Sequence, residues 1–130
     1  MKNLDFQGHF AGSKAHVDVR VGLFQFEENG LTYIYSPAFD LTGYGQNLKE
    51  AKTSFEVALE EFLTYTTNKK TFVKVLNKLG WKVKTSDFKS RKIRAPELAE
   101  LITKNSYLAE ILNEKDFTKF DQTVSVPAFV

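Results

Sequence analysis

The sequence predicts an α+β fold in one domain, with an antiparallel three-stranded sheet, a long helix, further short helices and a C-terminal strand. Three observations lead to this prediction: an alternating apolar segment near the start, an Asn-Gly pair between two strand-like segments, and a helical apolar stripe in the middle of the chain. The 130 residues, 42% of them hydrophobic, are enough for one domain with a single core. Since no internal repeat or linker is found, residues 1–130 are read as one domain.

The first strand is predicted near residues 16–27. Apolar residues alternate with polar or small ones from Val17 to Leu23, which is typical of a strand with one buried face. Phe24 and Phe26 then have the opposite parity. Either the strand bulges near Gly22, or its end is covered on both faces.

The second and third strands follow through a tight turn. Asn29-Gly30 is a strong hairpin signal, because both residues tolerate a positive φ. The β-branched and aromatic segment from Leu31 to Tyr35 is therefore expected to return antiparallel to the first strand. Pro37 ends regular pairing because it has no amide donor. Residues 41–44 can form a short third strand.

The long helix is predicted to begin at Asn47 or Leu48. Asn47 is a suitable N-cap, and Glu50 can complete a capping box. The apolar residues after it have the spacing of one helical stripe. These residues are Leu48, Ala51, Phe55, Ala58, Leu59, Phe62 and Leu63.

A second helix is predicted after Asn68, which can cap it, with Gly80 as its C-terminal stop. Its inward residues are Phe72, Val75, Leu76 and Leu79. A short strand from Trp81 to Lys84 follows, and residues 85–94 are read as a basic polar loop.

Pro96 fits the first turn of a third helix, with Leu98, Leu101 and Ile102 on one side. Leu108, Ile111 and Leu112 either prolong this stripe or belong to a separate helix capped by Ser106. Val124 and Val126 indicate a terminal strand, and Pro127 favours a place at the edge of the sheet.

The composition narrows the class of protein. The absence of Cys excludes disulfides, thiol catalysis and thiolate metal sites. There is no signal-peptide pattern at the N-terminus and no run of about 18 apolar residues, so we expect a cytoplasmic protein without a membrane span.

The charge is distributed unevenly along the chain. Residues 1–66 carry 5 Lys/Arg and 9 Asp/Glu (−4), residues 67–95 carry 10 Lys/Arg against Asp87 (+9), and residues 96–130 carry 3 against 6 (−3). These values add up to the net charge of +2. A basic block of this kind either binds an acidic partner or is neutralised by its flanks after folding.

No pattern in the sequence predicts a catalytic, metal or cofactor site. Gly43-Tyr44-Gly45 lacks the third glycine of a dinucleotide fingerprint and the Lys-Ser/Thr of a P-loop, so it is read as a tight strand-to-helix connection. His9 and His16 are too few ligands for zinc. A nuclease using Asp18, Glu27 and Asp40 would need them to converge on one face, and the parities of the first two differ. We therefore expect no enzyme activity.

The segment from Phe24 to Leu41 holds the predicted hairpin and Pro37. It is followed by Gly43, Gly45 and a helix that opens with Leu48-Lys49-Glu50-Ala51. In this order of features the sequence resembles the HicB antitoxin family. The resemblance covers residues 16–66, and it identifies 16–84 as a family-like core with 85–130 as a C-terminal extension. It implies a partial RNase H-like fold without catalytic carboxylates. It also implies homodimers or higher assemblies and a small ribonuclease toxin, HicA, as partner. Many members also carry a C-terminal DNA-binding domain, whereas residues 94–114 show no glycine turn between two helices.

Two candidate surfaces follow. A protein-binding surface of HicB type would use the hairpin and the segment after it, where the large rigid side chains are Tyr33, Tyr35, Phe39 and Tyr44. The alternatives are an orphan HicB-like regulatory domain and a nucleic-acid-binding protein that uses the basic segment 67–95. The phosphate contacts would then come from Lys82, Lys84, Lys89, Arg91, Lys92 and Arg94.

Overall fold

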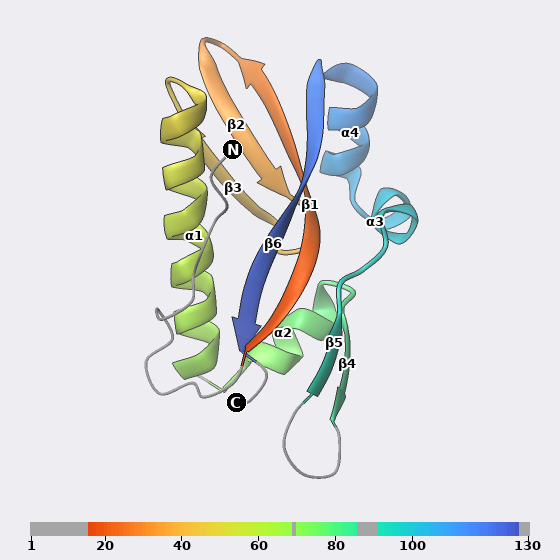
Figure 1. Ribbon diagram of the computed structural model, residues 1–130. Coiled ribbons are helices and arrows are strands. Elements are labelled where there is room, and N and C mark those ends of the chain that lie inside the picture. Colours follow the sequence, from red (N-terminus) through yellow and green to blue (C-terminus); the bar gives the residue numbers. More distant parts are fainter. Residues whose placement is uncertain (1–15, 69, 86–90, 128–130) are drawn as a thin grey trace.

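The computed structural model describes residues 16–68, 70–85 and 91–127. Figure 1 shows a twisted antiparallel sheet with one long helix, α1 (Leu48–Asn68), along one face, and two short helices near the other face. A separate two-stranded hairpin extends at the far end, beside a short helix. The chain is thus α+β, as predicted.

The main sheet has four strands rather than the predicted three. They are β1 (His16–Glu28), β2 (Leu31–Ser36), β3 (Leu41–Gly45) and β6 (Phe117–Pro127), in the order β3-β2-β1-β6. All neighbouring pairs are antiparallel. The last strand is longer than the sequence indicated, because Phe117 and Phe120 lie three residues apart and so do not show the two-residue period of a strand. Its place at the edge agrees with the prediction from Pro127.

The predicted hairpin between β1 and β2 is confirmed. Asn29 and Gly30 have φ values of 54° and 81°, in the left-handed region that this two-residue turn requires. The register pairs Phe24 with Tyr35 and Phe26 with Tyr33.

The change of parity within β1 comes from burial on both faces, not from a bulge. Each residue from His16 to Phe26 pairs with one residue of β6, including Gly22 with Asp121. Leu23 faces the core under α1, whereas Phe24 and Phe26 belong to a second core on the opposite face.

The helix α1 begins with the predicted cap. The Asn47 side chain accepts a hydrogen bond from the Glu50 amide (2.9 Å), and the Glu50 carboxylate accepts one from the Gln46 amide (2.9 Å). The buried apolar residues of α1 are Ala51, Phe55, Leu59 and Leu63. They pack on Val19, Val21, Leu23 and Ile34 of the sheet.

Gly43 and Gly45 allow α1 to approach β3 closely. A Cβ on Gly43 would lie 2.6 Å from the carbonyl oxygen of Ala51, and one on Gly45 would lie 2.9 Å from the Ala51 nitrogen. These distances are shorter than real Cβ contacts, so only glycine fits. This explains the two glycines as a requirement of helix–sheet packing.

The second helix, α2 (Phe72–Lys78), begins later than predicted. Asn68 is the last residue of α1, and the N-cap of α2 is Thr71, which makes no side-chain capping bond. The Thr71 amide instead donates to the carbonyl of Thr66 in the last turn of α1 (2.9 Å). This hydrogen bond ties the segment between α1 and α2 to the end of α1. Gly80 follows α2 with a φ of 96°, which agrees with its predicted role as a stop.

The prediction of a loop from residue 85 to 94 is wrong in its second half. β4 (Lys82–Thr85) pairs antiparallel with β5 (Arg91–Arg94) in a separate sheet. Val83 lies opposite Ile93, and both pack against the first core. One apolar residue in each strand is therefore enough to anchor this hairpin, and a pattern so short was hidden among the lysines and arginines.

The C-terminal stripe forms two helices, α3 (Leu98–Lys104) and α4 (Ser106–Glu114). Asn105 caps α4 by accepting a hydrogen bond from the Leu108 amide (2.9 Å), so Ser106 is the first residue of the helix and not its cap. Pro96 precedes the N-cap Glu97 and lies outside the first turn of α3. Leu108 and Ile111 of α4 complete the second core with Phe24, Phe26 and Tyr35.

Candidate binding surfaces

Two of the four predicted contact aromatics are core residues. Tyr35 and Phe39 are 1% and 2% exposed, so they offer no contact area to a partner. Phe39 packs on Phe62 and Trp81, with ring centroids 5.7 Å and 5.0 Å away. The segment after β2 turns inward at this point, which the sequence did not indicate.

Tyr35 links the β2–β3 turn to the start of α4. Its hydroxyl donates to the Asp40 carboxylate (2.8 Å) and accepts from the Asn105 side-chain amide (2.8 Å). Burial raises the pKa of Tyr35 well above its usual value, and the neighbouring Asp40 carboxylate raises it further. The Tyr35 side chain therefore stays protonated, and its hydroxyl remains a hydrogen-bond donor to Asp40.

The other two predicted aromatics form the outer part of an aromatic row, Phe26–Tyr33–Tyr44, on the face opposite α1. The Phe26 and Tyr33 rings stack with centroids 5.2 Å apart, and those of Tyr33 and Tyr44 are 6.1 Å apart. Exposure rises along the row, from 2% at Phe26 to 58% at Tyr44. The row thus presents an aromatic surface at the β3 edge, held in place by stacking.

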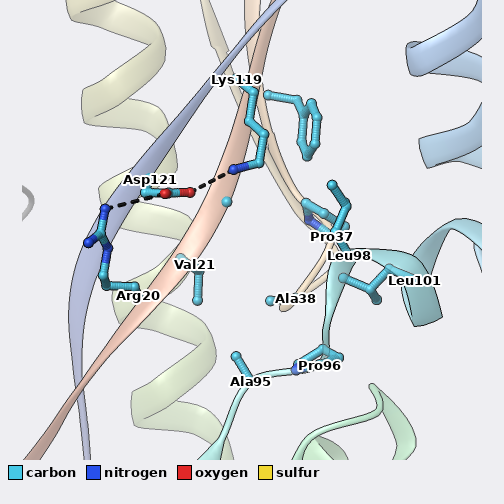
Figure 2. Close-up of a pocket in the computed structure, with 12 residues that line it drawn as sticks. Arg20, Val21, Pro37, Ala38, Ala95, Pro96, Leu98, Leu101, Lys119 and Asp121 are labelled. Atoms are coloured by element: carbon cyan, nitrogen blue, oxygen red, sulfur yellow. Dashed lines mark hydrogen bonds and ion pairs between the residues drawn. The ribbon is translucent and has the colours of Figure 1, made fainter.

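A small pocket of about 180 Å³ lies on the same face, farther along β1 and β6. Figure 2 shows the charged side chains of Arg20, Lys119 and Asp121 on one side, with Pro96 and Leu101 across from them. Its volume is below the range of about 300–1,000 Å³ that is usual for small-molecule sites. It is therefore too small to be the main site of a ligand.

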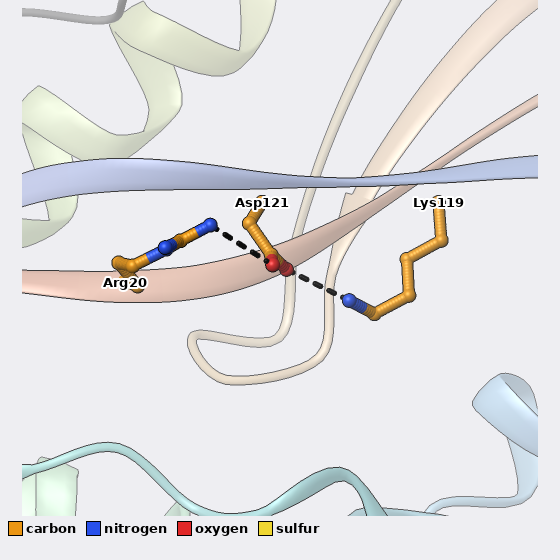
Figure 3. A network of polar contacts seen from close by, with 3 residues as sticks. All are labelled: Arg20, Lys119 and Asp121. Carbon is orange, nitrogen blue, oxygen red and sulfur yellow. Dashed lines mark hydrogen bonds and ion pairs between the residues drawn. The ribbon is translucent and has the colours of Figure 1, made fainter.

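The charges beside this pocket are paired with one another (Figure 3). The Asp121 carboxylate lies 2.7 Å from Lys119 Nζ and 3.3 Å from an Arg20 guanidinium nitrogen. The hydrogen bond from Lys119 lowers the pKa of Asp121, and Arg20 adds to this effect. The Lys119 side chain lies over Gly22, where a Cβ would be 3.2 Å from Lys119 Cε. Two cations share one carboxylate here, so the network keeps a net charge of +1, and all three side chains are exposed to solvent.

A larger open groove, of about 680 Å³, lies where the α2–β4 connection meets the α3–α4 junction. Lys78 and Lys82 line it on the side of α2 and β4, and Lys104, Asn105 and Tyr107 line it on the side of α3 and α4. Its volume is within the usual range for ligand sites.

Both carboxylates that line this groove already have hydrogen-bond partners. Asp40 accepts from the Tyr35 hydroxyl, and Glu100 accepts from the Glu97 amide at the start of α3 (3.3 Å). Within the described part of the chain, the three lysines of the groove have no hydrogen bond or ion pair. The groove therefore has three cations available to an anion.

The β4–β5 register continues this positive charge beyond the groove. It pairs Lys82 with Arg94 and Lys84 with Lys92, and we call these four residues the basic ladder. Like charges that are directly opposite in a sheet are destabilising. Arg94 forms an ion pair with Glu97 (3.3 Å), both exposed, and such surface pairs contribute little. Arg91 pairs with Thr85, and Lys89 lies outside the described residues.

The carboxylates considered for metal-dependent chemistry do not converge. Asp18 and Glu27 are nine residues apart on one strand, which corresponds to roughly 30 Å. Asp40 is bonded to Tyr35. Among the residues that the structure describes, no three His, Asp or Glu side chains are grouped as metal ligands, and His9 lies outside them. None of the described helices is both long and apolar enough to cross a membrane.

Sequence reasoning found Lys82 but missed the other groove residues. Lys78 and Lys104 end two different helices, and Tyr107 lies in the first turn of a third, so nothing local connects them. The available signal was that Lys78 and Lys104 each lie in the last helical turn, where a cation is favoured.

No family model, no curated protein and no solved structure matches this chain.

Proposed function

We propose that this chain is a non-catalytic protein-binding module of the HicB antitoxin type, which neutralises a small HicA-like ribonuclease. The observation that carries the proposal is the aromatic row, which ends in the exposed Tyr44 at the edge of the sheet. Rigid aromatic side chains of this kind are enriched in protein interfaces, because they bury a large area at a low entropic cost.

The order of elements supports the family assignment. The residues that carry the resemblance form a hairpin, a turn with Pro37, a third strand containing Gly43 and Gly45, and a helix that opens at Leu48. The partial RNase H-like architecture is part of the same proposal. Residues 1–66, which hold the aromatic row, have a net charge of −4, which complements a basic RNA-binding partner.

DNA binding by a ribbon-helix-helix domain is not part of the proposal. That motif pairs the strand of one subunit with the strand of another, ahead of two helices. In this chain β6 follows the helices and pairs with β1 of the same chain over eleven residues. The backbone groups on that side of β6 are already used.

The experiment combines the chain with a small basic ribonuclease encoded beside it and measures RNA cleavage and complex formation. The chain should inhibit cleavage and form a complex of defined stoichiometry. Tyr44→Ala should weaken this complex at least about tenfold, as expected for an aromatic residue at the centre of an interface. Tyr65→Ala is the matched control, because Tyr65 is similarly exposed (63%) but lies on α1. Equal affinity of both variants, or unchanged cleavage with the wild type, would reject the proposal.

The non-catalytic part of the proposal has its own test. The purified chain, incubated with Mg²⁺ or Mn²⁺, should leave single- and double-stranded RNA and DNA intact. Cleavage that disappears in Asp18→Asn would instead identify a nuclease that uses the carboxylates of the sheet.

A further inference from the structure

We infer that the groove between α2–β4 and the α3–α4 junction, together with the basic ladder, binds a single-stranded nucleic acid through its phosphodiester backbone. The observation that supports this site is the placement of Lys78, Lys82 and Lys104. They come from three different elements and line one groove of about 680 Å³. The inference does not depend on the aromatic row or on a toxin partner.

The groove is suited to an anion because its negative charges are already engaged. The Tyr35 hydroxyl donates to Asp40, and the Glu97 amide donates to Glu100, whereas the three lysines have no partner among the described residues. Lys78 and Lys104 interact favourably with the carboxyl ends of their own helices. Lys82 begins a strand and has no such role, so helix ends do not account for all three charges.

The ligand is a polymer because the positive charge continues past the groove. Lys82 lines the groove and also begins the basic ladder, where it is opposite Arg94. Farther along the two strands the register pairs Lys84 with Lys92, so the sequence of the hairpin stays cationic beyond Lys82 and Arg94. A chain of phosphates that follows the groove and the ladder would neutralise both.

One feature of the groove favours a single strand over a duplex. Tyr107 lines the groove and is 37% exposed, held edge-on against Tyr35 with ring centroids 4.8 Å apart, so it can stack with an unpaired base. The opposite face of the hairpin is packed through Val83 and Ile93. A ligand can therefore reach only the face of the hairpin that carries Lys82 and Arg94.

The test measures binding of the full chain to a fluorescent 20-nucleotide single strand of mixed sequence, as RNA and as DNA, by anisotropy between about 50 and 200 mM salt. Each phosphate contact in a single strand contributes about 0.7 to the slope of log K against log salt. The triple variant K78Q/K82Q/K104Q should therefore lower this slope by about 2. Tyr107→Leu should weaken binding at least about fivefold without changing the slope.

The matched control is K49Q/K70Q/K74Q, which removes the same charge from exposed lysines that do not line the groove. It should leave the slope unchanged. If both triple variants lower the slope equally, the groove is not the site and the inference fails. The inference also fails if the wild type binds neither RNA nor DNA at about 50 mM salt. Two further results would contradict it: a duplex of the same sequence that binds as tightly as the single strand, and poly-glutamate that competes as well as unlabelled oligonucleotide. RNA and DNA that bind equally support readout of the backbone alone, whereas a preference for RNA supports contacts that include the 2′-hydroxyl.

Discussion

At the residue scale, Gly43 shows how one missing side chain determines the distance between a helix and a strand. We expect Gly43→Ala to destabilise the fold by roughly 3 kcal/mol, because its Cβ would overlap the backbone of Ala51 and Phe55, which cannot move independently of α1. Gly22→Ala is the control, since its Cβ would meet only the ends of the Lys119 and Asp121 side chains and no backbone atom among its nearest neighbours. It should cost less than about 1 kcal/mol in urea unfolding. Similar losses for the two variants would contradict this account.

Tyr35 gives a prediction for alkaline pH. The pKa of Tyr35 in the folded state is raised above the ordinary 10.0. The stabilisation that the protonated Tyr35 hydroxyl gives the folded state is therefore complete below about pH 10 and is lost as the pH rises further. Tyr35→Phe removes the bonds to Asp40 and Asn105 and should cost about 1–2 kcal/mol at pH 8. The difference between wild type and variant should then narrow above pH 10. Tyr44→Phe, at an exposed ring, should show neither effect.

At the element scale, α1 contributes one face to the first core through Ala51, Phe55, Leu59 and Leu63. Phe55 is completely buried between the sheet and the helix, so Phe55→Ala should lower the free energy of unfolding by about 3–5 kcal/mol. Val57→Ala, in the same helix but 52% exposed, should change it by less than about 0.5 kcal/mol. A loss below about 1 kcal/mol for Phe55→Ala would mean that this residue is not part of the core.

The elements that could be predicted from the sequence are those that local chemistry determines. The Asn29-Gly30 turn, the Asn47 cap and the Gly80 stop each depend on residues close together in the chain, and all three are confirmed. β5 was missed because the evidence for it is its pairing with β4 and a single apolar residue, the partly buried Ile93. The groove was missed for the same reason, since tertiary packing alone brings Lys78 and Lys104 together.

At the scale of the whole molecule, the two edges of the sheet differ. On β3, the Tyr44 amide donates to the Ser54 hydroxyl (3.1 Å) and the Gln46 amide donates to Glu50, so α1 blocks this edge. β6 has a strand neighbour on one side only within the described part of the chain. The helices α3 and α4, which could have covered this edge, pack on a face of the sheet. An uncovered edge of this length tends to pair.

We therefore predict a homodimer through antiparallel β6 edges. Light scattering after size exclusion should give about 30 kDa, twice the 14.8 kDa of the chain. Thr123→Cys, at an exposed residue near the middle of β6, should form a disulfide-linked dimer under mild oxidation, whereas Thr64→Cys on α1 should not. A mass near 15 kDa at high protein concentration would exclude the dimer. Removing residues 122–130 is not a clean test of the contact, because Val124 and Val126 belong to the core.

The pairing of β1 with β6 also has a consequence for how the protein is made. The paired residues are between 91 (117 − 26) and 111 (127 − 16) positions apart in the sequence. A contact of such high sequence separation slows folding, because a long loop must close before it forms. During synthesis, β1 has left the ribosome while the residues of β6 have not yet been added. The nascent chain therefore has an open, valine-rich strand edge until β6 has been synthesised, and it is in this interval that the protein is most exposed to aggregation.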